Sequence, residues 1–362
     1  MTNKSDDTEA APGLLTNLAP AHKWALLVLL SVAIAGVLEW LHFPAGLLLG
    51  PMIASIVFAT NGARLSLPRL PFVASQALIG AMIARSLDRE ILSRVLDDWA
   101  AFLAVVLAVV FASSLIGYVL AKRQILPGTT AVWGTSAGAA SVMVLMADAY
   151  GADARLVAFM QYLRVVCVAS TATLMAAFAF NISGGTPPPF VLFPPVDWLG
   201  LVQTIVATAF FSYAGYLLRI PAGPMILPMA GLAIVAAFGL ITIELPPWLL
   251  ALAYTMVGWR IGLAFTRRLL RHAARALPQV LLSIALLIGL GGCLAFLLWW
   301  LLGIDPLTAY LATSPGGLDS VAIIAASTHV DVPFVLALQT LRFLVILAVG
   351  PPISRFVANR IG

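Results

Sequence analysis

Charge is scarce in this chain. Only 10% of its 362 residues are Asp, Glu, Lys or Arg, and 62% are hydrophobic. A soluble globular domain carries about 25% charged residues, so the composition excludes a soluble protein. Cysteine is scarce too: Cys167 and Cys293 both lie inside apolar runs, which favours two buried thiols over a disulfide framework. The strand pattern of a transmembrane barrel, which alternates over about ten residues, is absent.

Metal ligands and cofactor motifs are also lacking. The four histidines have no cysteine or carboxylate at metal-ligand spacing, so we expect no metal site. Residues 134–138 match the Gly-x-Ser-x-Gly pattern of hydrolases, but that motif needs a strand-to-helix turn and a histidine partner. We therefore expect that the protein is not an enzyme and that it has no catalytic residue and no cofactor. The net charge of +5 is explained better by basic cytoplasmic loops than by nucleic-acid binding, because no soluble basic module is present.

Long apolar runs fill most of the chain. They are roughly 17–25 residues long, which is enough for a helix to span a bilayer. We expect twelve such segments, at 24–41, 45–60, 71–86, 98–121, 129–149, 155–180, 197–218, 222–241, 246–266, 276–302, 307–328 and 332–354. Residues 1–22 are expected to form a disordered cytoplasmic tail without the pattern of a secretory signal. A proline-rich stretch predicts a linker at 181–196 between a first membrane repeat at 23–180 and a second at 197–356.

The second half of the chain repeats the first. The motif Thr-Ser-Ala-Gly at 135–138 returns 178 residues later as Thr-Ser-Pro-Gly at 313–316. At the same offset, Gln-Tyr-Leu-Arg at 161–164 returns as Gln-Thr-Leu-Arg at 339–342, and eleven of the 36 aligned pairs in this region are identical. Further upstream, Pro-Ala-Gly and Pro-Met elements also recur. A duplicated membrane chain with matched interruptions is typical of secondary transporters.

The distribution of Lys and Arg decides between two topologies. If all twelve segments cross, eight basic residues lie on one side and nine on the other, against the positive-inside rule. If segments 129–149 and 307–328 enter and leave on one face, the split becomes 14 to three. The 14 are Lys4, Lys23, Arg64, Arg69, Lys122, Arg123, Arg155, Arg219, Arg267, Arg268, Arg271, Arg275, Arg355 and Arg360, against Arg85, Arg89 and Arg94. This predicts an all-α polytopic membrane protein of two inverted repeats, each with five crossings and one re-entrant segment, and cytoplasmic termini. Twelve straight transmembrane helices are the alternative.

One arginine lies deep within the last apolar segment of each half. Arg164 and Arg342 each follow an aspartate, Asp153 or Asp331, by eleven residues, and both aspartates are expected to be helix N-caps. Eleven helical residues rise about 16 Å, roughly half of a bilayer core, so both arginines are expected near the midplane. Three roles are compatible with this position: binding an anion, capping the carbonyl end of a broken helix, and pairing with a carboxylate. The sequence leaves these roles open.

Further polar residues accompany the arginines. A half-helix that begins at the Thr-Ser motifs would direct backbone N–H groups and a positive dipole end at the midplane, although Ser and Thr also serve as small contacts between helices. The expected solute-binding residues are Thr135, Ser136, Gly138, Gln161, Arg164, Thr313, Ser314, Gly316, Gly317, Gln339 and Arg342. Asp319 is a carboxylate inside segment 307–328. It is expected to carry a coupling proton or Na⁺, or to form a salt bridge with one of the arginines.

These motifs resemble the AbrB-type integral membrane protein family. The resemblance rests on the duplicated Pro-Ala-Gly, Thr-Ser-x-Gly and Gln-x-x-Arg elements and covers residues 25–355. It implies an inner-membrane protein that has been described as a regulator of gene expression, an ammonia monooxygenase or a transporter, distinct from the soluble DNA-binding regulator of the same name. Ala137, Ala139 and Ser141 depart from the Pro-Gly-Gly-Leu-Asp pattern of the second half, so any acid-dependent role depends on that half alone. A monooxygenase needs a metal or organic cofactor, and because the sequence shows no site for one, we do not expect monooxygenase activity.

The function expected from the sequence is a secondary transporter of a small anionic solute, with a midplane site between two inverted repeats. The alternative is a membrane sensor or regulatory protein that affects gene expression indirectly and moves no solute. The expected location is a bacterial-type inner (plasma) membrane, crossed several times. The expected partners are the lipid bilayer and a small solute, with a homodimer left open and no nucleic acid.

Overall fold

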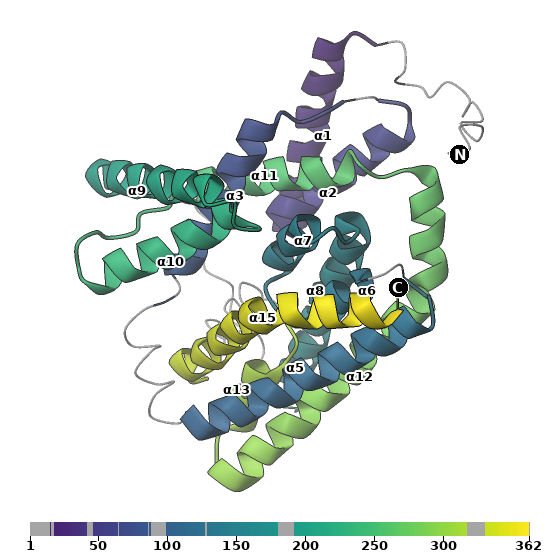
Figure 1. Ribbon diagram of the computed structural model, residues 1–362, viewed down its shortest axis with the longest axis vertical. Coiled ribbons are helices and arrows are strands. Elements are labelled where there is room, and N and C mark those ends of the chain that lie inside the picture. Colours follow the sequence, from purple (N-terminus) through teal and green to yellow (C-terminus); the bar gives the residue numbers. More distant parts are fainter. Residues whose placement is uncertain are drawn as a thin grey trace.

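The chain folds entirely into helices over the described residues. The computed structural model describes residues 15, 18–41, 46–63, 65–85, 87, 99–126, 129–179, 192–316 and 330–361, with the backbone alone at 172–179, 358 and 361. Its helices are α1 (Pro20–Trp40), α2 (Gly46–Thr60), α3 (Arg69–Arg85), α5 (Trp99–Lys122), α6 (Thr130–Thr135), α7 (Ala140–Ala149), α8 (Ala154–Ala179), α9 (Trp198–Leu217), α10 (Gly223–Ala237), α11 (Pro247–Gly262), α12 (Arg267–Leu302), α13 (Pro306–Thr313) and α15 (Val332–Ile361) (Figure 1). Gly317, Asp319, the tail at 1–14 and most of the expected linker lie outside the described residues.

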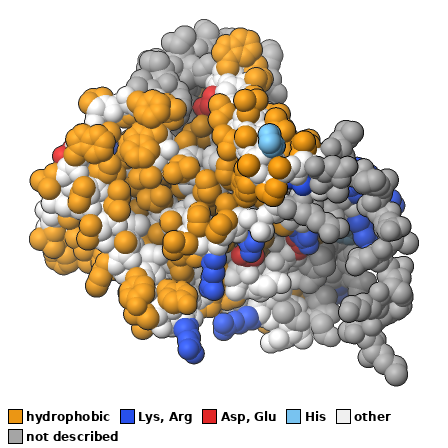
Figure 2. Space-filling view, turned by 90° about the horizontal axis from the view of Figure 1, so that it is seen from above, with side chains coloured by type: hydrophobic (Ala, Val, Ile, Leu, Met, Phe, Trp, Pro, Cys, Tyr) orange, Lys and Arg blue, Asp and Glu red, His pale blue; other side chains and the backbone are white. Residues whose placement is uncertain are grey.

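The surface of the molecule is that of a multi-pass membrane protein. Six of the described helices, α1, α5, α8, α9, α12 and α15, are long and apolar enough to cross a membrane. Their outer faces carry large apolar side chains, and Figure 2 shows such side chains spread over one face of the molecule. Leu29 is 69% exposed and Phe210 is 66% exposed. Helices satisfy their own backbone hydrogen bonds, so such faces suit contact with lipid tails.

Most helix bounds agree with the apolar segments to within four residues, and three corrections are needed. Helix α1 begins at Pro20, so residues 20–22 of the expected tail are helical. Helix α12 begins at Arg267 rather than 276, because the Thr266 side chain caps it by accepting from the N–H of Leu269. Its first two turns are basic, so a search for apolar runs misses them. Helix α15 runs on to Ile361 instead of ending at 354.

Segment 129–149 is not a single straight helix. It consists of α6 and α7, separated by residues 136–139. In the second half, α13 likewise ends at Thr313, directly before Ser314. The alternative of a straight helix over 129–149 is therefore wrong.

The helices pack as two bundles, and each bundle takes helices from both halves of the chain. The first contains α1, α2, α3, α9, α10 and α11; the second contains α5, α6, α7, α8, α12, α13 and α15. Figure 1 shows the first bundle above and the second below. Helices α8 and α11 touch across the boundary between the bundles.

Within the first bundle, α2 packs on α11 and α3 packs on α10. Both crossings need a glycine. A Cβ on Gly80 would lie 2.3 Å from the carbonyl oxygen of Met225, and a Cβ on Gly258 would lie 2.8 Å from that of Leu48. These glycines are 178 residues apart, so the duplicated sequence produces the same close crossing twice.

Candidate functional site

The Thr-Ser motifs interrupt a helix in each half. After Thr135, Ser136 turns to φ −58° and ψ 122°, and after Thr313, Ser314 turns to φ −57° and ψ 138°. Both turns leave the helical region at the same position of the repeat. The carbonyl groups at the end of each short helix lose their partners in the next turn, so other donors must satisfy them.

In the first half, Gln161 and Arg164 of α8 supply those donors. The Gln161 side-chain nitrogen donates to the carbonyl oxygens of Trp133 (2.7 Å) and Ser136 (2.9 Å). The Arg164 guanidinium donates from Nη1 to the carbonyl of Ser136 (2.6 Å) and from Nη2 to that of Gly138 (2.9 Å). The planar fork of arginine suits two acceptors at once.

The second half repeats this arrangement. Gln339 of α15 donates to the carbonyl oxygens of Leu311 (2.8 Å) and Ser314 (3.2 Å). Arg342 donates from Nη1 to the carbonyl of Ser314 (2.7 Å) and from Nη2 to that of Gly316 (3.1 Å). Every acceptor lies 178 residues after its counterpart in the first half.

The two threonines also act in matched ways. The hydroxyl of Thr135 donates to the carbonyl oxygens of Ser113 and Ala131, both at 2.9 Å. The hydroxyl of Thr313 donates to those of Gly291 (2.9 Å) and Ala309 (2.8 Å). Each hydroxyl thus joins its broken helix to the long helix before it, α5 or α12.

The arginines are buried and carry charge that no described carboxylate balances. Arg164 and Arg342 are each 1% exposed, and among the described residues neither forms an ion pair with a carboxylate. The Nε–H of each has no hydrogen-bond partner among those residues. The geometry is that of caps on the helix breaks, and direct contact of these side chains with a solute stays a prediction.

Each interrupted segment is closed at its base. The Asp153 N–H donates to the Thr130 hydroxyl (3.1 Å), which joins the residue before α8 to the start of α6. The Asp331 N–H donates to the Thr308 hydroxyl (3.2 Å) in the second half. The chain from Thr130 to Asp153 therefore returns to where it began, whereas a straight helix of that length would separate these residues by roughly 35 Å.

The expected N-caps are confirmed. The Asp153 carboxylate accepts from the Arg155 backbone N–H (3.0 Å), and the Asp331 carboxylate accepts from the Phe334 N–H (3.0 Å). Asp153 also pairs with the Arg155 guanidinium at 2.8 Å. Burial tends to raise the pKa of Asp153, but the hydrogen bonds and charge of Arg155 outweigh it and hold that pKa below its usual value.

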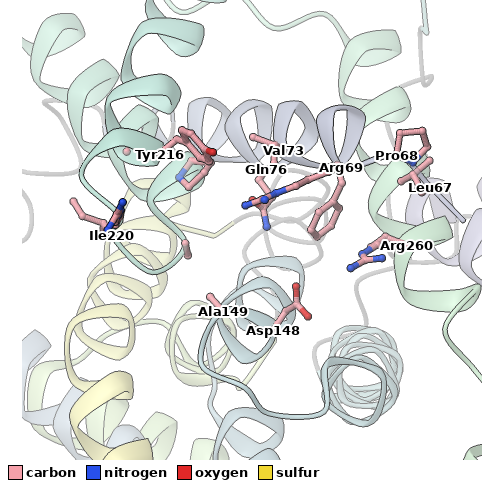
Figure 3. A pocket seen from close by; sticks show the side chains of 15 residues that line it. Leu67, Pro68, Arg69, Val73, Gln76, Asp148, Ala149, Tyr216, Ile220 and Arg260 are labelled. Atoms are coloured by element: carbon pink, nitrogen blue, oxygen red, sulfur yellow. The ribbon is translucent and has the colours of Figure 1, made fainter.

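Two adjoining cavities lie where the bundles meet, and sequence reasoning missed both. One of about 510 Å³ is lined by α3, α7, the α9–α10 turn and α11, and it includes Arg69, Gln76, Asp148, Arg219 and Arg260 (Figure 3). A second of about 410 Å³ shares Phe72, Asp148 and Arg260 with it. None of the described residues among those predicted to bind solute lines either cavity. Arg260, a cation inside an apolar segment, was the one signal in the sequence.

No metal site is found in the described part of the chain. There, no three His, Cys, Asp or Glu side chains come together as metal ligands. Cys167 and Cys293 are free thiols, but Cys167 is half-buried and Cys293 is exposed, so the expectation of two buried thiols is wrong for Cys293.

Comparison with known proteins gives one family. The model of a family described as "Transition state regulatory protein AbrB" matches residues 47–358. A protein of Escherichia coli (strain K12) named "Putative regulator AbrB" is 46% identical over 341 residues, which cover 94% of this chain and 98% of that protein. "Uncharacterized protein YhjN" of Bacillus subtilis (strain 168) is 27% identical over 300 residues, 78% of this chain and 77% of that protein. Neither name is that of an enzyme.

Proposed function

The chain belongs to the AbrB family of membrane proteins, and from that premise we propose that it is a secondary transporter of a small anionic solute. The proposal depends above all on the two matched helix breaks. Non-helical backbone at membrane depth is tolerated where it is buried in protein or lines a cavity. In transporters, paired broken helices of this kind surround the solute and the coupling ion.

The two halves are proposed to be inverted repeats. Support comes from packing that exchanges the halves: α2 contacts α11, and α3 contacts α10. The hydrogen bonds that close segments 130–153 and 308–331 support one re-entrant segment in each half.

The proposed topology leaves both termini in the cytoplasm of a bacterial-type inner membrane. The side of the molecule that carries the 14 basic residues, the basic face, is assigned to the cytoplasm. Two of its arginines join helices there: Arg155 donates to the carbonyl oxygen of Ala264 (2.9 Å), and Arg267 donates to that of Thr60 (2.8 Å). The exposed tryptophans of the described residues lie at helix ends that this topology assigns to the opposite face: Trp40, Trp99, Trp198, Trp299 and Trp300. Tryptophan favours the membrane–water interface, so these side chains are consistent with the proposed orientation.

The solute is proposed to pass between the two bundles. The first bundle contains no helix break among its described residues, whereas the second contains the breaks after Thr135 and Thr313. A movement of one bundle past the other would expose the breaks to one side of the membrane and then to the other, as alternating access requires. Arg164 and Arg342 are proposed to have two roles. They hold the breaks, and their charge, which no carboxylate of the described residues balances, makes the membrane interior favourable for an anion.

A membrane sensor is the second candidate, and the name of the Escherichia coli relative favours it. Such a protein binds a solute without moving it and influences gene expression indirectly.

Reconstitution into proteoliposomes separates the two candidates. Labelled small anions, including succinate and inorganic phosphate, are offered under an imposed proton or Na⁺ gradient, with protein-free liposomes as control. Gradient-dependent accumulation supports the transporter. Saturable binding of a solute without accumulation, across the whole panel, would favour the sensor.

A further inference from the structure

The cavity of about 510 Å³ has the composition of an anion-binding site. Arg69 of α3, Arg219 of the α9–α10 turn and Arg260 of α11 line it together with the buried amide of Gln76. Asp148, at the end of α7, is the only carboxylate among the described residues of the lining. Three guanidinium groups and one carboxylate leave a net charge of about +2 at neutral pH.

Two arginines of this cavity lie over aromatic rings. Arg69 lies over the ring of Tyr216 at 5.8 Å, and Arg260 lies over the ring of Phe72 at 5.5 Å. Within the described residues, no carboxylate lies at ion-pair distance from any of the three. Aromatic faces position a guanidinium while leaving its N–H groups available. Figure 3 shows Arg69, Asp148 and Arg260 extending into the same space.

The turn that carries Arg219 has an unusual backbone. Arg219 and Ala222 have φ values of 53° and 52°, which place two non-glycine residues in the left-handed region. Both line the cavity. Such conformations cost free energy, and they cluster at ligand sites, where the surrounding structure enforces them.

The second cavity extends the first along the bundle boundary. It shares Phe72, Asp148 and Arg260 with the first, and it continues past Leu145 of α7 to Asp153. Asp153 is bonded to the base of the first broken segment. The two cavities therefore follow the side of α7, the helix that directly follows the first break.

The positions that the repeat relates to Gln76 and Arg260 lack these polar groups. At the offset of 178, Gln76 of α3 corresponds to Tyr254 of α11, and Arg260 of α11 corresponds to Met82 of α3. The hydroxyl of Tyr254 contacts the sulfur of Met82 at 3.0 Å. The helix pair α3 and α11 therefore presents an amide and a guanidinium to the cavity, whereas the equivalent positions of the same two helices bring a tyrosine and a methionine together. The cationic lining is thus specific to one of the two equivalent sites.

We propose that this cavity is a one-sided anion-binding site, in which Arg69, Arg219 and Arg260 bind a small solute carrying one or two carboxylate or phosphate groups. Paired N–H groups of arginine match the oxygens of both group types. The site would receive or release the anion at the basic face. Onward movement of the anion rests on the proposed transport function, whereas binding does not.

Binding of succinate and of inorganic phosphate to the full chain in detergent tests the assignment. Isothermal titration gives the affinity and a thermal-unfolding shift checks it, with chloride at matched ionic strength as reference. We expect at least one probe to bind, and Arg260→Gln to weaken its affinity by about tenfold or more, which is about 1.4 kcal/mol. Arg85→Gln, at the other end of α3 and outside the cavity lining, is the matched control and should not change the affinity.

A second variant fills the cavity with residues that the protein already accommodates elsewhere. Gln76→Tyr combined with Arg260→Met installs the pair found at 254 and 82. The variant should remain folded and lose binding. The assignment would be overturned if the double variant still binds the probe, or if Arg85→Gln weakens binding as much as Arg260→Gln does. It would also be overturned if neither probe binds the unaltered chain.

Two further measurements separate the causes of failure. If phosphatidylglycerol, added to phosphatidylcholine nanodiscs, displaces the probe, the occupant is a lipid headgroup and the free-anion assignment is wrong. If Arg260-dependent binding is found without flux, the transport proposal fails and the site stands. If flux persists with unchanged KM in Arg260→Gln, the site fails and transport stands.

Discussion

Replacing Arg342 by lysine tests how the second helix break is held. Arg342 donates from two different nitrogens to the carbonyls of Ser314 and Gly316, at 2.7 and 3.1 Å. An ammonium is a single point charge and lacks the planar fork that satisfies two separated acceptors. The variant therefore leaves one buried carbonyl unsatisfied. The loss of a hydrogen bond from a charged donor costs about 1.5–3 kcal/mol, and we expect the free energy of unfolding to fall by that amount.

The assay is reversible chemical unfolding in detergent micelles, followed by tryptophan fluorescence. Arg164→Lys should show a loss of similar size, because its two bonds match those of Arg342. Arg260→Lys is the control, since the Arg260 side chain is exposed and caps no described carbonyl; its effect should stay within about 0.5 kcal/mol. An unfolding free energy unchanged by Arg342→Lys would refute the reasoning that this side chain holds the break.

The solute affinity of the same variants addresses the second proposed role. If the charge of Arg342 also attracts the solute, affinity should fall by roughly 1–3 kcal/mol in the fraction that remains folded. Normal affinity together with a large loss of stability would make both arginines structural caps alone.

Three further predictions concern topology, helix packing and coupling. Cysteines placed beside Lys122 and beside Arg155 should be labelled from the same side of the membrane, because the segment between them closes on itself; labelling from opposite sides would contradict the inverted repeats. Gly80→Ala should lower the free energy of unfolding by about 1–3 kcal/mol, since α3 and α10 must move apart, whereas Gly36→Ala, with open space around it, should not. Asp319→Asn should abolish gradient-driven uptake while substrate exchange continues; a variant that no longer folds in detergent would indicate a salt bridge instead.

Local structure follows from this sequence more readily than packing does. The helix breaks at Thr135 and Thr313 were predicted from motifs that weaken a helix, and the caps at Asp153 and Asp331 from their place before an apolar run. These features depend on neighbouring residues, so a local pattern reveals them. The early start of α12 was missed because its first turns are basic rather than apolar.

The pairing of helices depends on contacts between distant residues. Helix α2 packs on α11 across the two halves, and the close approach at Gly258 allows this packing. In the sequence, nothing distinguishes Gly258 from the many other glycines until the partner backbone is known. The arginine-lined cavity has the same origin. Arg69, Arg219 and Arg260 lie in three segments without a shared motif, and only packing brings them together.

Uptake into proteoliposomes is the decisive measurement of whether this protein moves a small anion across the membrane. Labelled succinate and inorganic phosphate are followed under an inward proton or Na⁺ gradient, and the gradient is then collapsed with an ionophore. A secondary transporter should accumulate label above the level of protein-free liposomes and lose it when the gradient is collapsed. Saturable binding of either anion with no accumulation under either gradient would rule out the proposed transport.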